Sequence, residues 1–176
     1  MKRILATATV ILALGFILPS LALADGPINL GVFTPIQIVK EDQAVTAFRF
    51  SLIYGVNTDL TGVDLSLVGV NHGSVTGIQF TAIGLVDGSF TGWQNGIGCI
   101  TKGKFTGYQS GMVYNSVGSG SGVQFGLYNK AGEFSGFQLG LLNIVDSMTS
   151  GLQIGIINII NNKDKLKLFP IVNWKF

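Results

Sequence analysis

Apolar and polar residues alternate with a period of two through most of the chain after residue 45, as in the stretch Gly136–Leu141. After a leading glycine, the first, third and fifth positions are mostly apolar, whereas the second is usually glutamine and the fourth usually glycine. Successive side chains of a β-strand point to opposite faces. The pattern therefore predicts strands with one apolar face and one face of amides and small residues.

This pattern is repeated along the chain. The leading glycines are Gly62, Gly77, Gly92, Gly107, Gly122, Gly136 and Gly151, at spacings of 15, 15, 15, 15, 14 and 15 residues. Each unit closes with turn-forming residues such as Asp87-Gly88-Ser89 and Lys102-Gly103-Lys104, and most of the charged residues lie in these turns. Each unit thus predicts one strand of about 8–10 residues followed by a turn of about five.

A related unit precedes the first glycine, and both ends of the domain add an alternating segment with a proline, Pro35 or Pro170. Proline lacks the N–H that a strand ladder needs, so these terminal segments are expected at an edge or a seam. The total is about ten strands, two of them terminal and eight at the repeats.

The favoured interpretation is an all-β fold, an antiparallel up-and-down transmembrane β-barrel of about ten strands. Strands of this length approach the span of a membrane strand, and a barrel places an apolar face in lipid and a polar face in its lumen. Closure also removes exposed strand edges. The candidate lumen-lining residues are Gln79, Gln94, Gln109, Gln124, Gln138 and Gln153.

The alternative architecture is a β-solenoid or an open repeat sheet, in which each unit stacks on the next and the glutamines form a ladder. Two features favour the barrel over the solenoid. A repeat of about 15 residues is short for a coil that must turn at least twice. An outer surface poor in charge is also unusual for a protein in water, and only 11% of this chain is charged.

The N-terminus predicts export. Lys2 and Arg3 precede an apolar run that ends in Ala22-Leu23-Ala24, which is typical of a signal peptide comprising residues 1–24. The remainder, residues 25–176, is expected to form a single β-repeat domain with a net charge near zero, which argues against a nucleic-acid partner. The expected location is the outer membrane, with the periplasm or secretion as alternatives.

Two stretches carry a resemblance to known proteins. The units Gly122–Asn129 and Gly136–Asn143, of the form Gly-x-Gln-x-Gly-Leu-x-Asn, resemble a family of bacterial surface repeat-containing proteins. The tail, with Trp174 and the terminal Phe176, is similar to the C-terminal assembly signal of outer-membrane β-barrels. The second resemblance implies a Gram-negative outer membrane, with its lipid and the barrel-assembly machinery as partners; the first implies no established activity.

Residues capable of catalysis or metal binding are scarce. His72 is the only histidine and Cys99 the only cysteine, so neither a metal cluster nor a catalytic dyad is expected. Cys99 is interpreted as a small buried residue on the apolar face of its strand. The segment Gly98–Lys104 mimics a phosphate loop, but it is followed by Phe105 and lies within the repeats, so no nucleotide is expected. We expect no enzyme activity, catalytic residue, cofactor or metal.

Three functions remain open at this point. The first is a non-enzymatic outer-membrane or cell-surface protein with a structural or interaction role, whose surface ligand is unknown. The second is a narrow pore for small polar solutes, although a barrel of about ten strands is nearly filled by its own side chains. The third is a soluble, exported β-solenoid that binds partners.

Overall fold

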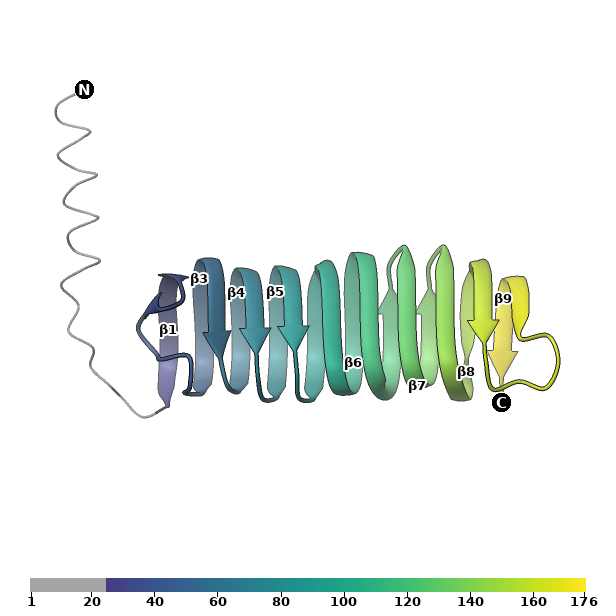
Figure 1. Ribbon diagram of the computed structural model, residues 1–176, viewed down its shortest axis with the longest axis horizontal. Helices are drawn as coiled ribbons and strands as arrows, with labels where there is room; N and C mark the ends of the chain where they lie inside the picture. The colour runs from purple at the N-terminus through teal and green to yellow at the C-terminus, as the bar shows by residue number, and fades with distance from the viewer. Residues whose placement is uncertain (1–24) are drawn as a thin grey trace, which may run out of the picture.

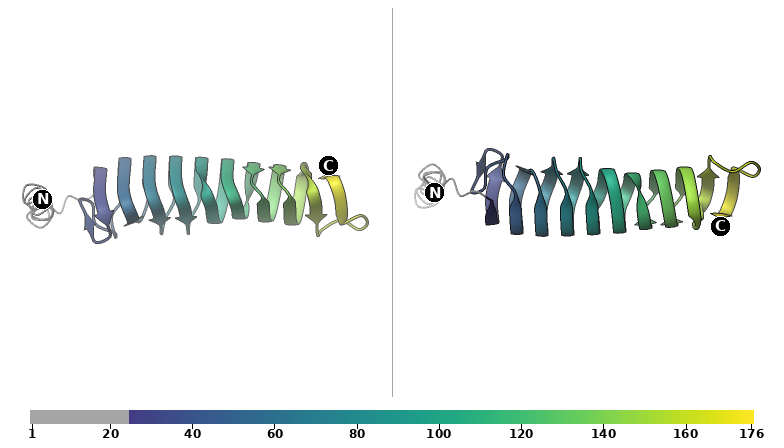
Figure 2. Two further views of the ribbon diagram at one scale, coloured as in Figure 1. Left: turned by 90° about the horizontal axis from the view of Figure 1, so that it is seen from above. Right: turned by 90° about the horizontal axis from the view of Figure 1, so that it is seen from below.

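The chain forms a β-solenoid, a straight stack of coils with its two ends far apart (Figure 1; Figure 2). The structure, a computed structural model, describes residues 25–176; the expected signal peptide, residues 1–24, lies outside the described residues. The strands are β1 (Gly26–Phe33), β2 (Ile36–Gln37), β3 (Val45–Asn57), β4 (Leu60–Asn71), β5 (Val75–Val86), β6 (Phe90–Phe125), β7 (Tyr128–Leu139), β8 (Leu142–Ile160) and β9 (Leu168–Lys175).

Neighbouring repeats pair in parallel, each residue against its equivalent in the next coil. In the pairing of β4 with β5, Gly62 lies opposite Gly77, and Gln79 of β5 lies opposite Gln94 of β6 in the same manner. The strands form one sheet in the order β2-β1-β3-β4-β5-β6-β7-β8-β9. Among the strands of residues 25–176, only β2 against β1 and β9 against β8, at the two ends of the stack, are antiparallel pairs.

The prediction of an antiparallel transmembrane barrel is therefore wrong, and the solenoid named as its alternative is the observed fold. Alternation with period two separates two faces of a strand but does not indicate whether the neighbouring strand runs parallel or antiparallel. The strand count also differs. The expected turn at Lys102–Lys104 lies inside β6, a strand of 36 residues that continues through more than two repeats.

The leading glycines explain how so short a repeat can close a coil. Gly77 and Gly92 have φ angles of +135° and +131°, in a region that residues with a Cβ rarely adopt. A Cβ built on Gly92 would overlap the carbonyl oxygen of Gly77 in the coil below. Glycine is thus required at this position for two reasons, the positive φ of the backbone and the close approach of successive coils.

The interior of each coil is apolar at one edge of the solenoid and polar at the other. At the end where the charged turns lie, which we call the turn edge, the interior is apolar and contains residues such as Val75, Phe90 and Phe105. Phe90 and Phe105 stack on each other with their ring centroids 5.8 Å apart. At the opposite end, the interior is filled by glutamine and asparagine side chains that are fully buried.

The breaks between strands occur at different ends in the two halves of the molecule. From β3 to β6 they fall at the turn edge, for example at Asp87–Ser89, whereas β6, β7 and β8 are separated at the opposite edge, at Gly126-Leu127 and Gly140-Leu141 (Figure 1). The later turns contain the Gly-Leu-x-Asn part of the repeat. The Asn129 amide donates a hydrogen bond to the Gly126 carbonyl (3.3 Å), which closes this turn from inside.

Candidate functional site

The outside of the amide-filled edge is an exposed apolar surface, which we call the apolar ridge. Its tip carries one large apolar side chain from each coil, with between 44% and 65% of each exposed. The tip residues are Leu52, Leu67, Ile97, Met112, Leu127, Leu141 and Ile156, and in the coil of β5 Ile83, which follows Ala82 at the equivalent position and pairs with Val68. Turns that meet water usually expose glycine, asparagine, aspartate or serine. A row of aliphatic residues at successive turn tips indicates a surface that contacts something apolar.

One flank of the ridge continues the apolar surface in several coils. Phe50, Leu65, Phe80 and Phe125 are all exposed on the strand that leads to the tip. Equivalent positions in two central coils carry Asn95 and Ser110 instead. These smaller side chains leave an open groove of about 620 Å³ between Met112, Phe125 and Leu127.

Aromatic residues with a polar atom border the ridge on both sides. Trp93 and Tyr108 lie four residues before the tip of their coils, and their rings meet edge to face with centroids 6.1 Å apart. Tyr114 and Tyr128 lie just after the tip, and their ring centroids are 5.2 Å apart. Tyrosine and tryptophan combine an apolar body with a polar end, which suits a boundary between an apolar phase and water.

The glutamines predicted as lumen-lining residues lie inside the solenoid, beneath the ridge, and form a continuous ladder. The Nε2 atom of Gln94 donates to Oε1 of Gln79, and Nε2 of Gln109 donates to Oε1 of Gln94, both at 2.8 Å. The same contact joins Gln124, Gln138 and Gln153 to the preceding coil. Because a solenoid coil is filled by its own side chains, these residues support the fold rather than a solute path.

An asparagine ladder runs beside the glutamine ladder in the later coils and has the opposite direction. The Nδ2 atom of Asn115 donates to Oδ1 of Asn129 (2.8 Å) in the next coil, and Asn129 donates to Asn143 in the same way (2.8 Å). The amide dipoles of the two ladders therefore point in opposite directions along the solenoid. Asn129 and Asn143 end the Gly-x-Gln-x-Gly-Leu-x-Asn units of the sequence, but the motif alone did not predict this ladder.

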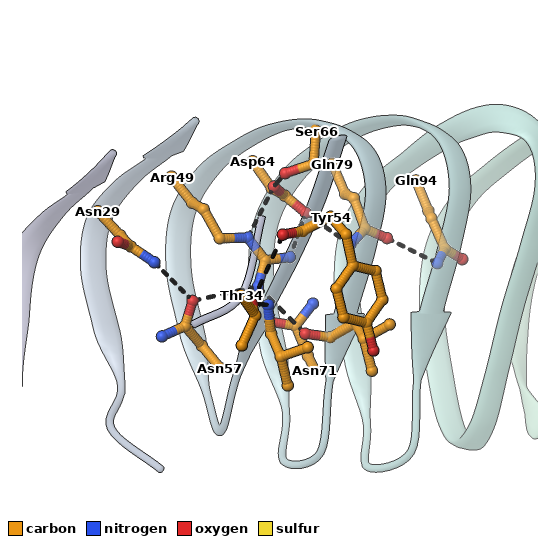
Figure 3. A network of polar contacts seen from close by, with 12 residues as sticks. Asn29, Thr34, Arg49, Tyr54, Asn57, Asp64, Ser66, Asn71, Gln79 and Gln94 are labelled. Carbon is orange, nitrogen blue, oxygen red and sulfur yellow. Dashed lines mark hydrogen bonds and ion pairs between the residues drawn. The ribbon is translucent and has the colours of Figure 1, made fainter. Parts of the chain in front are cut away.

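At the N-terminal end, the glutamine ladder begins on a buried ion pair (Figure 3). Arg49 donates from Nε and Nη2 to the two carboxylate oxygens of Asp64, at 2.9 and 2.6 Å, and both side chains are fully buried. Gln79 then donates to the same carboxylate (2.8 Å). The guanidinium also donates to Asn71 Oδ1 (3.1 Å), so every charged atom is hydrogen-bonded, as a buried pair requires.

This pair was not predicted, although the sequence carries a signal for it. Arg49 and Asp64 occupy the glutamine position of the two repeats that precede Gln79. Charged residues at a position that is otherwise buried and uncharged indicate that they compensate each other.

The candidate chemical residues do not form a reactive site. His72 Nδ1 lies 2.8 Å from Asp87 Oδ2, and Lys102 Nζ lies 2.7 Å from the other carboxylate oxygen, all on the turn edge. Hydrogen bonds from Lys102 and then His72 hold the pKa of Asp87 below its ordinary value. Among residues 25–176, no three His, Cys, Asp or Glu side chains are grouped closely enough to hold a metal ion.

Cys99 points into the solenoid, whereas Trp93 and Ile97 point outward, so its expected place on the apolar face is wrong although its expected burial is observed. Burial raises the pKa of its thiol to about 12. The phosphate-loop mimic Gly98–Lys104 runs as an extended part of β6.

The two candidate assembly-signal residues lie at the C-terminal end of the stack. Trp174 lies in β9, where its ring meets Phe169 edge to face and the Lys163 ammonium lies 5.6 Å from its centroid. Phe176 is almost fully exposed. Both residues belong to the coil that covers β8, so the structure gives them a place in the C-terminal cap of a solenoid.

Comparison with protein-family models, curated proteins and solved structures gave no match to this chain. In the part of the chain that the structure describes, no helix is long and apolar enough to cross a membrane.

Proposed function

We propose that this protein is an exported, non-catalytic β-solenoid that attaches to a lipid bilayer through its apolar ridge. The observation that carries the proposal is the row of exposed aliphatic residues at the ridge tip, one from each coil. In this proposal the protein lies on the outer membrane or another envelope surface and has a structural or interaction role there. Lipid is still the partner in this proposal, but the protein binds the surface of the bilayer and its strands do not cross it.

The composition of the ridge favours lipid over a polar partner. The chain contains no Asp, Glu, Lys or Arg from Leu65 to Leu85, a stretch that includes two ridge tips. The next charged side chains, Asp87 and Lys102, pair with each other at the turn edge. An element that rests in a membrane interface places its apolar side in the acyl boundary and its charges in water. The aromatic residues on both margins, such as Trp93 and Tyr128, would then lie at the level of the headgroups.

The arrangement of the interior favours the same partner. In a solenoid that is surrounded by water, the apolar side chains are expected inside along the whole coil. Here the main apolar cluster lies under the charged turn edge, and the glutamine ladder and the ridge-turn asparagines lie under the ridge. The half of the coil that is apolar outside is therefore polar inside, and the half that is charged outside is apolar inside.

The proposal is tested by flotation of the exported, purified protein with phosphatidylcholine vesicles in a density gradient. The variant Leu127→Glu/Leu141→Glu removes two tip residues and adds two charges. Burial of one leucine contributes about 1.5–3 kcal/mol, and each tenfold change in partition requires about 1.4 kcal/mol. We expect the double variant to bind vesicles at least about tenfold more weakly than the parent.

The matched control is Thr76→Glu/Thr106→Glu, which adds the same charge at two exposed positions outside the ridge. It is expected to float with the vesicles like the parent. If parent, ridge variant and control all remain at the bottom of the gradient, the lipid proposal fails. A parent that forms dimers sensitive to Leu127→Glu/Leu141→Glu, but does not bind vesicles, would identify a second copy as the occupant of the ridge instead.

A further inference from the structure

The charges of the chain are separated along the solenoid axis. Residues 25–100 contain six acidic and two basic side chains, a net charge of −4, whereas residues 101–176 contain three acidic and seven basic ones, a net charge of +4. Because the coils follow the chain order in a straight stack, this division in sequence is also a division in space (Figure 2). The domain has almost no net charge but has an acidic N-terminal half and a basic C-terminal half.

The separation is strongest on the two terminal coils. Asp25, Glu41 and Asp42 are exposed around β1 and the segment that follows β2. At the other end, Lys165 and Lys167 are exposed in the loop between β8 and β9. Lys163, in the same loop, already donates to Asn173 Oδ1 (2.8 Å), so it serves the interior of the cap. Lys40 and Asp164 are exposed beside these groups, so it is the net charge that differs, negative at the N-terminal end and positive at the C-terminal end.

The terminal coils also have strand edges without a neighbour. β9 is the last strand of the sheet, and β2 pairs with only two residues of β1, Gly31 and Phe33. An unpaired strand edge is a template for another chain. Pro170 and the lysines near β9 limit indiscriminate pairing at that edge, since proline has no N–H and like charges repel. A partner with acidic groups at its own edge is not subject to this repulsion.

We propose that copies of this protein associate head to tail, with the basic C-terminal coil of one against the acidic N-terminal coil of the next. The two surfaces differ, so the contact is heterologous, and a pair of copies retains one free surface of each kind. In a straight molecule such a contact does not close into a ring. The product is a linear filament whose apolar ridges lie in one row when the coils continue in register.

Analytical ultracentrifugation of the exported protein tests this proposal in a non-ionic detergent that covers the ridge, so that lipid binding plays no part. Self-association is expected in 50 mM salt and is expected to weaken at least about tenfold in 500 mM salt, because salt screens exposed charges. Variant A, Lys165→Glu/Lys167→Glu, makes both ends acidic. Variant B, Glu41→Lys/Asp42→Lys, makes both ends basic.

Each variant alone is expected to be monomeric, and an equimolar mixture of the two is expected to associate as the parent does, because every contact in it again joins opposite charges. Lys104→Glu/Lys130→Glu, which reverses two exposed charges along the turn edge, is the control and should associate like the parent. A parent that is monomeric in 50 mM salt, or a mixture of A and B that stays monomeric while the parent associates, overturns the proposal. Vesicle flotation of the parent is unaffected by either outcome, so the two proposals fail separately.

Discussion

At the scale of single residues, the close stacking of the coils constrains two positions of the repeat, the leading glycine and the buried glutamine. The leading glycine cannot carry a Cβ, and the next inward-pointing residue must satisfy its polar atoms within a dry interior. Glutamine does so because its amide both donates and accepts, so each copy bonds the coil before it and the coil after it. The exchange of glutamine for Arg49 and Asp64 retains this continuity with a charge pair.

The glycine requirement predicts a large difference between two glycines of the same strand. Gly92→Ala introduces a Cβ at a φ of +131° and against the carbonyl oxygen of Gly77, and is expected to lower the free energy of unfolding by at least about 2 kcal/mol. Gly98→Ala places its Cβ where no atom lies within 4 Å and should change the free energy of unfolding by less than about 1 kcal/mol. Urea denaturation followed by circular dichroism compares them; equal effects would show that the coils do not stack at Gly92.

The buried ion pair predicts that the double variant is more stable than a single one. Asp64→Asn leaves the Arg49 guanidinium buried beside a neutral partner and is expected to cost about 3–5 kcal/mol. Arg49→Gln/Asp64→Gln extends the glutamine ladder into these two coils and is expected to recover a large part of that loss. The same denaturation measurement decides this, and a double variant less stable than Asp64→Asn would contradict the equivalence of these positions.

At the scale of elements, the coil of 15 residues has one turn chemistry at each edge. The turn edge uses glycine with charged or hydroxyl residues, as at Asp87–Ser89, which is ordinary for a turn in water. The ridge turns of the later coils combine a glycine, an exposed leucine and an inward asparagine. The asparagine supplies from inside the hydrogen bonds that water would supply to an ordinary turn, so the outside of the turn is free to be apolar.

This division of roles predicts the effect of removing one ridge-turn asparagine. Asn129 donates to the Gly126 and Leu139 carbonyls and to Asn143, and accepts from Asn115. Asn129→Ala leaves several of these buried groups unpaired, and we expect a loss of about 2–3 kcal/mol in the free energy of unfolding. Asn95→Ala, which removes an outward asparagine, should be nearly neutral. A loss of equal size in both variants, measured by thermal denaturation, would contradict the role assigned to Asn129.

At the scale of the whole molecule, the sequence predicts the faces of the strands but not their assembly. Period-two alternation assigns Gln94 and Gln109 to one face and Trp93 and Tyr108 to the other, and the structure has them inside and outside the coil, respectively. The direction of pairing is not contained in that alternation. The equal spacing of identical residues carries it, because only a parallel stack in register places Gln94 on Gln79 and Gln109 on Gln94.

Two features were not predicted from the sequence: the conformation of the leading glycines, which arises from contacts between coils, and the distribution of the exposed charges. The φ of the leading glycines reflects the closeness of one coil to the next, and the prediction of uninterrupted strands of 8–10 residues took no account of it. The low charge of the outer surface was weighed against the solenoid, although it belongs to the ridge alone. The exposed charges lie at the turn edge and on the two terminal coils.

The most direct test of the account measures where two edges of the same coils lie on a membrane. Cys99 is buried and its thiol pKa is raised to about 12, so a nitroxide reagent should label only an added cysteine, at Leu127→Cys on the ridge tip or Glu133→Cys on the turn edge. Electron paramagnetic resonance power saturation on vesicle-bound protein then compares access of oxygen, which concentrates in lipid, with access of a water-soluble nickel complex. The account predicts that oxygen dominates at residue 127 and nickel at residue 133. Equal access of the nickel complex to both labels would contradict it.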